Sequence, residues 1–324
     1  MLKEFAPMNA AELFDRTIDV YKKSFGKQLA FAAIMGVISF IGMMIFGFVL
    51  AFIIIFSTAT FLGAIAIDEA VLIILPIIVV LVLSPLLLLW TAVSNSGHMI
   101  LAKQAFYGHY IKLPYAEMPK MALRVFTALL AQFLLIIPFI LVVGGLAVLL
   151  FPVWDMLFLV GYGNVLPVVS LVLFVLLTVV GFAVFTNIFA VTTAVAIFED
   201  KYFFSAVSRA FGLIRDEFWR ILGIRILWIA VIFTTVMSIQ GVFAIVQQFS
   251  FFFAGSIGTT AAILLALFGF FGSIVSIAAN FLIMPLDGIF QTMIYFNQRI
   301  KKDGLDIEIA IEKTALPKYV QVKL

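Results

Sequence analysis

The chain has 324 residues, of which 65% are hydrophobic and only 11% are charged, and its net charge is +3. Soluble domains are closer to half apolar and a quarter charged, so this composition excludes a water-soluble globule. It also excludes intrinsic disorder, which requires low hydrophobicity. The absence of cysteine excludes disulfides, thiolate catalysis and cysteine-bound metals. We therefore expect an all-α, polytopic membrane helical bundle.

Six apolar stretches are long enough to cross a bilayer, because a hydrocarbon core of about 30 Å requires about 20 apolar residues in a helix. Their unbroken apolar runs favour helices over the alternating strands of a barrel. The polar residues 1–28 before the first stretch show no signal-peptide pattern. The predicted spans are Leu29–Phe56, Val71–Val93, Val125–Leu150, Pro167–Phe198, Ile221–Val246 and Thr259–Met284.

The basic residues lie on one side of this predicted arrangement. All 20 lysines and arginines fall in four segments, residues 1–28, 98–124, 199–225 and 299–324. Cytoplasmic loops are enriched in Lys and Arg, so we predict six spans with both termini in the cytoplasm. The chain then divides into an N-terminal amphipathic helix (1–28), a membrane domain (29–296) and a C-terminal tail (297–324).

Two of the basic segments show helical amphipathicity. Apolar residues recur at three- and four-residue spacing in both, as Leu13, Phe14, Ile18, Tyr21 and Phe25, and as Val207, Phe211, Ile214 and Phe218. Such helices commonly lie in the membrane interface. Arg16, Lys22 and Lys27 align with Arg209, Arg215 and Arg220 at a constant offset. This alignment indicates an internal repeat, or the general likeness of juxtamembrane helices.

Basic side chains at a cytoplasmic face attract anionic lipid by about 1 kcal/mol each. The candidate contacts for lipid headgroups or a protein partner are Arg16, Lys22, Lys27, Arg209, Arg215, Arg220, Arg299 and Lys301. The alternative is that these residues only set the topology. Because their role in setting the topology accounts for these basic residues, we expect no nucleic-acid partner.

Ionisable residues within spans are costly, at about 2.5–3.5 kcal/mol near the bilayer centre. Asp287 follows Pro285 in an apolar run too long for one crossing, so we expect a kink or restart there. We predict that Arg225, early in the fifth span, approaches Asp287. The alternative is that Arg225 extends to the interface and Asp287 caps the following helix. The candidate intramembrane polar site comprises Asp287, Arg225, Asn187, Asn280 and Gln132, which line a pocket or only bridge helices.

Motifs of known enzymes are missing from the sequence. It has no P-loop, no HExxH and no Gly-x-Ser-x-Gly. His98 and His109 are predicted to lie in one cytoplasmic loop without clustered carboxylates, so we expect no metal, cofactor or catalytic residue. Glycines in the first and third spans read as close-packing positions, namely Gly36, Gly42, Gly47, Gly144 and Gly145.

Three stretches form an ordered pattern along the chain. The first is LFDRTIDVYKKSFGKQL near the N-terminus. The second is carried by Glu199, Ala206, Arg209, Arg215, Phe218, Trp219 and Arg220, and the third by Tyr295, Arg299, Lys301, Gly304, Asp306 and Glu308. The set resembles the bacterial membrane domain fused to some glycerophosphodiester phosphodiesterases, and its stand-alone relatives.

The chain departs from that pattern in two ways. Asn297 stands where the family prefers Asp, and Asp303 where it prefers Glu. The phosphodiesterase barrel with its metal-binding residues has no counterpart. The resemblance therefore implies a membrane module of a bacterial plasma membrane and not an esterase.

Two functional classes follow from these observations. The first is a non-enzymatic accessory or scaffold subunit that engages anionic lipid or a cytoplasmic or membrane protein partner. The alternative is a small transporter or flippase for a lipid or hydrophobic peptide. A solvated cavity reaching the polar residues of the spans favours transport, whereas a packed bundle centre favours the scaffold.

Overall fold

The computed structural model describes residues 6–61, 69–108, 113, 118–159, 165–253, 259–308 and 311. In these residues every regular element is a helix, which confirms the all-α class. The helices are α1 (Ala10–Phe61), α2 (Glu69–Tyr107), α3 (Met118–Leu159), α4 (Val165–Asn187), α5 (Thr192–Phe198), α6 (Phe203–Ile214), α7 (Phe218–Phe253) and α8 (Thr259–Asp303). A short 3-10 turn, η2 (Arg215–Glu217), joins α6 to α7.

Five helical segments of the described chain are long and apolar enough to cross a membrane. They are Ala10–Gly42, Met118–Leu150, Val168–Phe198, Phe203–Gly241 and Gly269–Asp303. The predicted second span, Val71–Val93, lies in α2, and most of its side chains fall outside the described part. Large apolar side chains stay exposed along the five segments, such as Leu149 (72%) and Leu177 (69%). An exposed apolar surface of this extent requires lipid or a protein partner to cover it.

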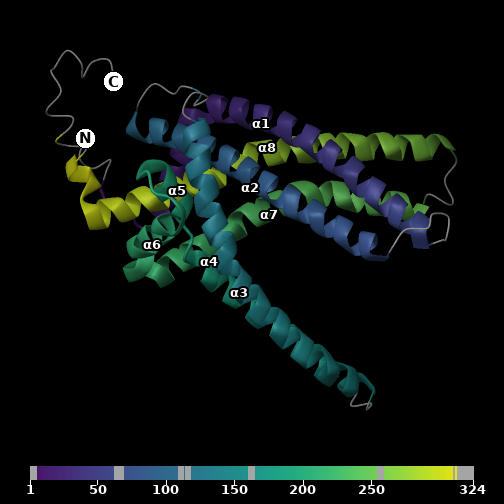
Figure 1. Ribbon diagram of the computed structural model, residues 1–324. Coiled ribbons are helices and arrows are strands. Elements are labelled where there is room, and N and C mark those ends of the chain that lie inside the picture. The colour runs from purple at the N-terminus through teal and green to yellow at the C-terminus, as the bar shows by residue number, and fades with distance from the viewer. Residues whose placement is uncertain are drawn as a thin grey trace.

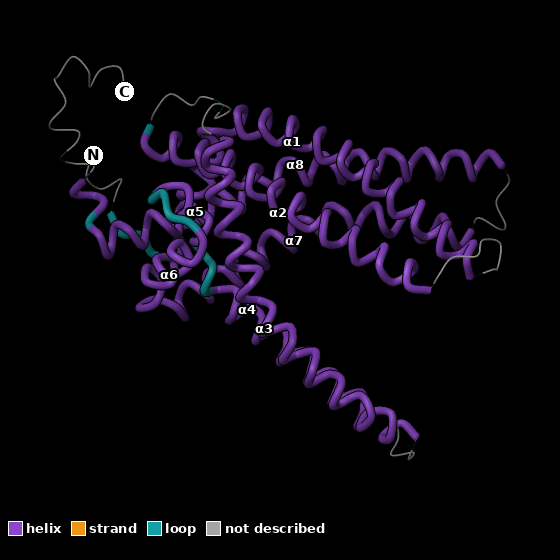
Figure 2. The backbone as a smooth tube through the Cα atoms, in the orientation of Figure 1, coloured by secondary structure: helices purple, strands orange, loops and turns teal. Residues whose placement is uncertain are grey.

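Two groups of helices extend from a common base. Helices α1, α2, α7 and α8 run together as a bundle, and the α3–α4 hairpin departs from one end of it in another direction (Figure 1). The base contains α5, α6, the first turns of α1, α3 and α7, and the last turns of α2 and α8 (Figure 2). The start of α1 and the end of α8 therefore lie together in the base.

The base has a packed apolar core built around aromatic rings. Trp228 stacks on Phe290 with ring centroids 4.4 Å apart, and Phe14 stacks beside both at 5.7 and 5.8 Å. Phe296 lies between Phe106 and Phe198, at 4.8 and 5.4 Å. Stacked aromatic pairs add stability beyond the area that they bury, so these rings join α1, α2, α5, α7 and α8 into one unit.

The N-terminal amphipathic stretch is not a separate helix. It forms the first turns of α1, which runs without interruption for 52 residues, so no break marks the predicted boundary at residue 28. The stretch lies along α8, where the Tyr21 hydroxyl donates to the Leu282 carbonyl at 2.7 Å. The second amphipathic stretch does form a separate helix, α6, which buries Val207 and Ile214. Phe211, predicted on that buried face, is 40% exposed.

The predicted kink or restart at Pro285 is not a helix break. Helix α8 continues through Pro285 for 45 residues. Proline removes one N–H donor from the helical ladder, and neighbouring helices can satisfy the carbonyls that this leaves. Pro285 leaves the Phe281 carbonyl without its donor, and the Tyr21 hydroxyl bonds to the neighbouring carbonyl of Leu282 in the same turn.

Only one of the five predicted close-packing glycines has that role within the described chain. A methyl group on Gly36 would overlap the ring of Phe281, so the glycine lets α1 approach α8 closely. Open space surrounds Gly42, Gly47, Gly144 and Gly145. Gly97, which sequence analysis did not single out, lies equally close to the ring of Phe31 and brings α2 near α1.

We predict that Gly36→Ala destabilises the protein by about 1–3 kcal/mol, the usual cost of overpacking, because the Phe281 ring must move. Gly42→Ala is the matched control, since its methyl group meets no atom and alanine is the better helix former. Thermal unfolding of both variants in the same detergent checks this. Equal melting temperatures for the two variants would contradict the close α1–α8 packing.

Candidate functional site

Arg225 binds the end of a neighbouring helix. Its Nη1 donates to the Thr186 carbonyl at 3.2 Å and to Asn187 Oδ1 at 3.3 Å. Both partners lie at the C-terminus of α4, where a cation is favourable because the helix dipole is negative there. Arg225 therefore holds the α3–α4 hairpin against α7, a role that neither sequence-based alternative included.

Asp287 lies on the chain surface and accepts a hydrogen bond from Gln291 Nε2 at 2.7 Å. It is close enough to Arg225 for the two charges to attract each other. No ion pair joins them in the described part of the chain, where Arg225 uses its donors on α4. The structure thus places the two residues within electrostatic range of each other, with no ion pair between them.

The three amides of the candidate polar site do not converge. Asn187 is buried and donates to the Phe218 carbonyl at 3.0 Å, which ties α4 to α7. Asn280 is exposed and donates to the Ser276 carbonyl of its own helix at 2.9 Å. The Gln132 Nε2 atom on α3 is buried without a partner in the described chain. None of these residues, nor Asp287 or Arg225, lines any of the three main cavities of the described part.

Four of the eight basic candidates form ion pairs with Glu199, Glu217 or Asp303 of the base. Arg209 binds Glu199 at 2.9 Å and also binds Asp303. Arg299 binds Asp303 at 3.2 Å.

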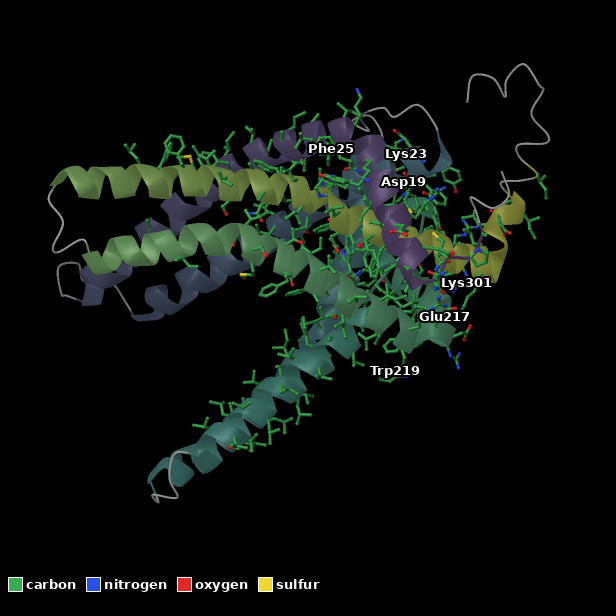
Figure 3. All side chains as sticks on the ribbon, turned by 180° about the vertical axis from the view of Figure 1, so that it is seen from behind. Asp19, Lys23, Phe25, Glu217, Trp219 and Lys301 are labelled. Atoms are coloured by element: carbon green, nitrogen blue, oxygen red, sulfur yellow. The ribbon has the colours of Figure 1, made fainter. Side chains whose placement is uncertain are left out.

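The other two, Lys301 and Arg220, converge on one carboxylate, Glu217, at 2.7 and 3.2 Å. Figure 3 shows Lys301 and Glu217 side by side on the base. These ion pairs join α6, η2 and α7 to the end of α8, so lipid contacts at the four residues would compete with internal partners.

The remaining basic candidates differ in exposure and pairing. Arg16 is half-buried, contacts Asp19 at 3.7 Å and lies over the ring of Phe106. Lys22, Lys27 and Arg215 are exposed and form no ion pair with the described residues. These three are the predicted contacts whose charge remains available to a ligand or partner.

His98 was predicted in a loop, and this prediction is wrong. It lies inside α2 and is only 2% exposed, because α2 continues to Tyr107. Its Nδ1 lies 2.6 Å from Gln28 Oε1, and Gln28 Nε2 donates to the His98 carbonyl at 3.1 Å. The ring also meets the edge of Phe31 at 4.9 Å. His98 lies beyond the predicted span 71–93, and burial lowers its pKa to about 4. His109 falls outside the described residues.

The comparisons with known proteins identify no relative. Neither a protein-family model, a curated protein nor a solved structure matches the chain. In the described residues no group of three or more His, Asp or Glu side chains is placed to hold a metal ion. The account of function therefore rests on the geometry of the base.

We predict that Arg209→Gln destabilises the protein by about 1–3 kcal/mol, since charged hydrogen bonds are worth about 1.5–3 kcal/mol and this arginine is partly exposed. Lys23→Gln is the control, because Lys23 forms only an exposed pair with Asp19 on its own helix, worth about 0.3–0.5 kcal/mol. Thermal unfolding separates the two. If the Arg209 variant were as stable as the Lys23 variant, the claim that these ion pairs stabilise the base would be contradicted.

We predict that the free energy of unfolding falls as the pH drops from about 6.5 to about 4, in part through His98. The unfolded chain protonates this side chain below its usual pKa, whereas the buried side chain stays neutral until about pH 4. The contribution of neutral His98 to the free energy of unfolding is complete above about pH 6.5. It decreases by up to about 3 kcal/mol as the pH falls across that window. Comparing wild type with His98→Gln at several pH values isolates it, and parallel curves would contradict it.

Proposed function

We propose that this chain is a non-enzymatic, multi-pass membrane scaffold or accessory subunit whose base lies at the cytoplasmic surface and engages anionic lipid or a protein partner. The observation that carries the proposal is the base itself. It is packed around aromatic rings and joined by ion pairs, while the polar residues of the spans tie α4 to α7 or lie apart on α3 and α8 and line none of the described cavities. An arrangement of this kind supports holding and docking rather than passage of a substrate.

The proposed topology has six spans with both termini in the cytoplasm. The described parts of all four basic segments belong to the base or adjoin it, at the start of α1 and the end of α8 (Figures 1 and 2). An enrichment of Lys and Arg on one side of the spans is typical of the cytoplasmic face. Helix α2, with 39 residues, supplies the sixth span beside the five apolar segments. A bacterial plasma membrane is proposed from the resemblance of the three stretches alone.

The alternative is a small transporter or flippase, and one observation favours it. The carboxylate of Asp287 lies exposed near Arg225, at the junction between the bundle and the base. A charged group at such a depth commonly marks an ion or substrate path. The scaffold is preferred because Asn187, which Arg225 contacts, is fully buried, and because neither Gln132 nor Asn280 extends this group into a continuous polar surface.

We predict that single cysteines at Lys22 and Glu308 react with a membrane-impermeant thiol reagent only when the cytoplasmic face is accessible. A cysteine at Asp155, in the segment predicted to face outward, should react only from the opposite side. The natural chain has no cysteine, so each label reports one position. Labelling of Lys22→Cys and Asp155→Cys from the same side would contradict the topology.

Gentle purification from native membranes, followed by mass spectrometry of everything retained, tests the function. We expect a stoichiometric protein partner or a selected anionic lipid, and a weaker yield of it from a K22Q/K27Q/R215Q variant. Lys23→Gln serves as the control because this lysine already has a carboxylate partner. Recovery of the chain with neither a partner nor an enriched anionic lipid would contradict the proposal.

A further inference from the structure

A groove lies where the α3–α4 hairpin meets the base. It has a volume of about 540 Å³ and is lined by Val184 of α4, Ile188 in the turn directly after α4, Phe211 of α6, the η2 turn, and Phe218 to Arg220 at the start of α7. The groove therefore combines side chains from a membrane-spanning helix with side chains from the charged base. None of the five candidate intramembrane residues contributes to it.

The floor of the groove is apolar and continues onto a lipid-facing surface. Val184 and Ile188 lie at the end of α4, and the preceding turns expose Leu177 (69%) and Val180 (50%). An acyl chain lying along α4 would thus reach the groove without leaving an apolar surface. Trp219, at the rim, is 73% exposed, and Figure 3 shows it on the outer edge of the base. Tryptophan is enriched at membrane–water boundaries because its ring is apolar and its N–H is polar.

The rim carries an excess of positive charge. Asp216 binds Lys302 at 2.6 Å and Glu217 binds Lys301 at 2.7 Å, so lysines of α8 neutralise both carboxylates. Arg220 is exposed and contacts Glu217 at 3.2 Å, a carboxylate that Lys301 already satisfies. Arg215 is exposed and makes no ion pair with the described residues. Arg215 is therefore available to meet an anion beside the apolar floor, and Arg220 can join it by giving up a contact with a carboxylate that Lys301 already neutralises.

We propose that this groove binds one anionic phospholipid of the adjacent leaflet. The acyl chain packs on Val184, Ile188 and Phe211, the phosphate lies between Arg215 and Arg220, and Trp219 covers the glycerol region. Charge complementarity and the continuity of the floor with α4 select a lipid over a free anion, which gains nothing from apolar contacts. The inference rests on the proposed function, because it requires the base to lie at the membrane surface.

The test uses the full chain in nanodiscs of equimolar phosphatidylglycerol and phosphatidylcholine, with retained lipids counted by native mass spectrometry. Wild type should retain one phosphatidylglycerol in preference to phosphatidylcholine. The R215Q/R220Q variant should weaken this retention by about 30-fold, since each basic residue at a membrane surface contributes about fivefold. The charge-matched control is K23Q/K120Q, which removes two exposed lysines that lie outside the groove and are not candidate lipid contacts, and it should leave the retained lipid unchanged.

A second variant tests the floor without altering charge. Val184→Trp fills the groove and should reduce lipid retention while both arginines remain. Variants with an unchanged melting temperature are folded and can be compared directly. Two results would overturn the site: retention by R215Q/R220Q equal to wild type, or an equal loss in K23Q/K120Q, which indicates only diffuse attraction. Either result leaves the scaffold proposal standing if a partner still co-purifies, so the two failures are distinguishable.

Discussion

The packing of α1 against α8 holds the two ends of the chain together, and the remaining helices are arranged around it. Asn297 Oδ1 accepts from the Met8 N–H at 2.8 Å, and Asn297 Nδ2 donates to the Met8 carbonyl at 3.2 Å. Farther along, Gly36 lets the Phe281 ring reach the backbone of α1. The hydrogen bonds between Met8 and Asn297 join residues 289 positions apart in the sequence. The base can therefore form only when the chain between them has folded back on itself.

The charges of the base divide into two groups with different consequences. Carboxylates of η2 and of the segment after α5 form ion pairs with basic residues of α6 and α8. Most basic residues near the C-terminal end of α8 are therefore paired within the protein. Lys22, Lys27 and Arg215 keep their charge for external contacts. The unpaired positive charge of the base is therefore smaller and more localised than the sequence alone indicates. Because Arg215 lies beside Trp219, the groove differs from a uniformly basic surface.

Sequence reasoning predicted the all-α class and the apolar character of the spans, because both follow from composition and continuous hydrophobic runs. It also located Gly36, since small residues let membrane helices approach closely. It could not locate the ion pairs, whose partners are distant in sequence, as with Lys301 and Glu217 (|i−j| = 84). His98 was misplaced because the apolar pattern ends near residue 93, whereas α2 continues by packing on α1. The continuity of α8 at Pro285 was not predicted, because proline normally interrupts helices. The Tyr21 hydroxyl that bonds beside this proline comes from another helix, α1.

The central claim is that the polar side chains of the spans tie helices together and do not line an aqueous path. Single cysteines at Gln132, Asn187 and Asn280, in a chain that has none, test it most directly in intact membranes. The account predicts that a membrane-impermeant thiol reagent labels none of them from either side, while a cysteine at Lys22 reacts readily. Labelling of Gln132→Cys together with Asn280→Cys would show a water-filled route between α3 and α8 and contradict the scaffold.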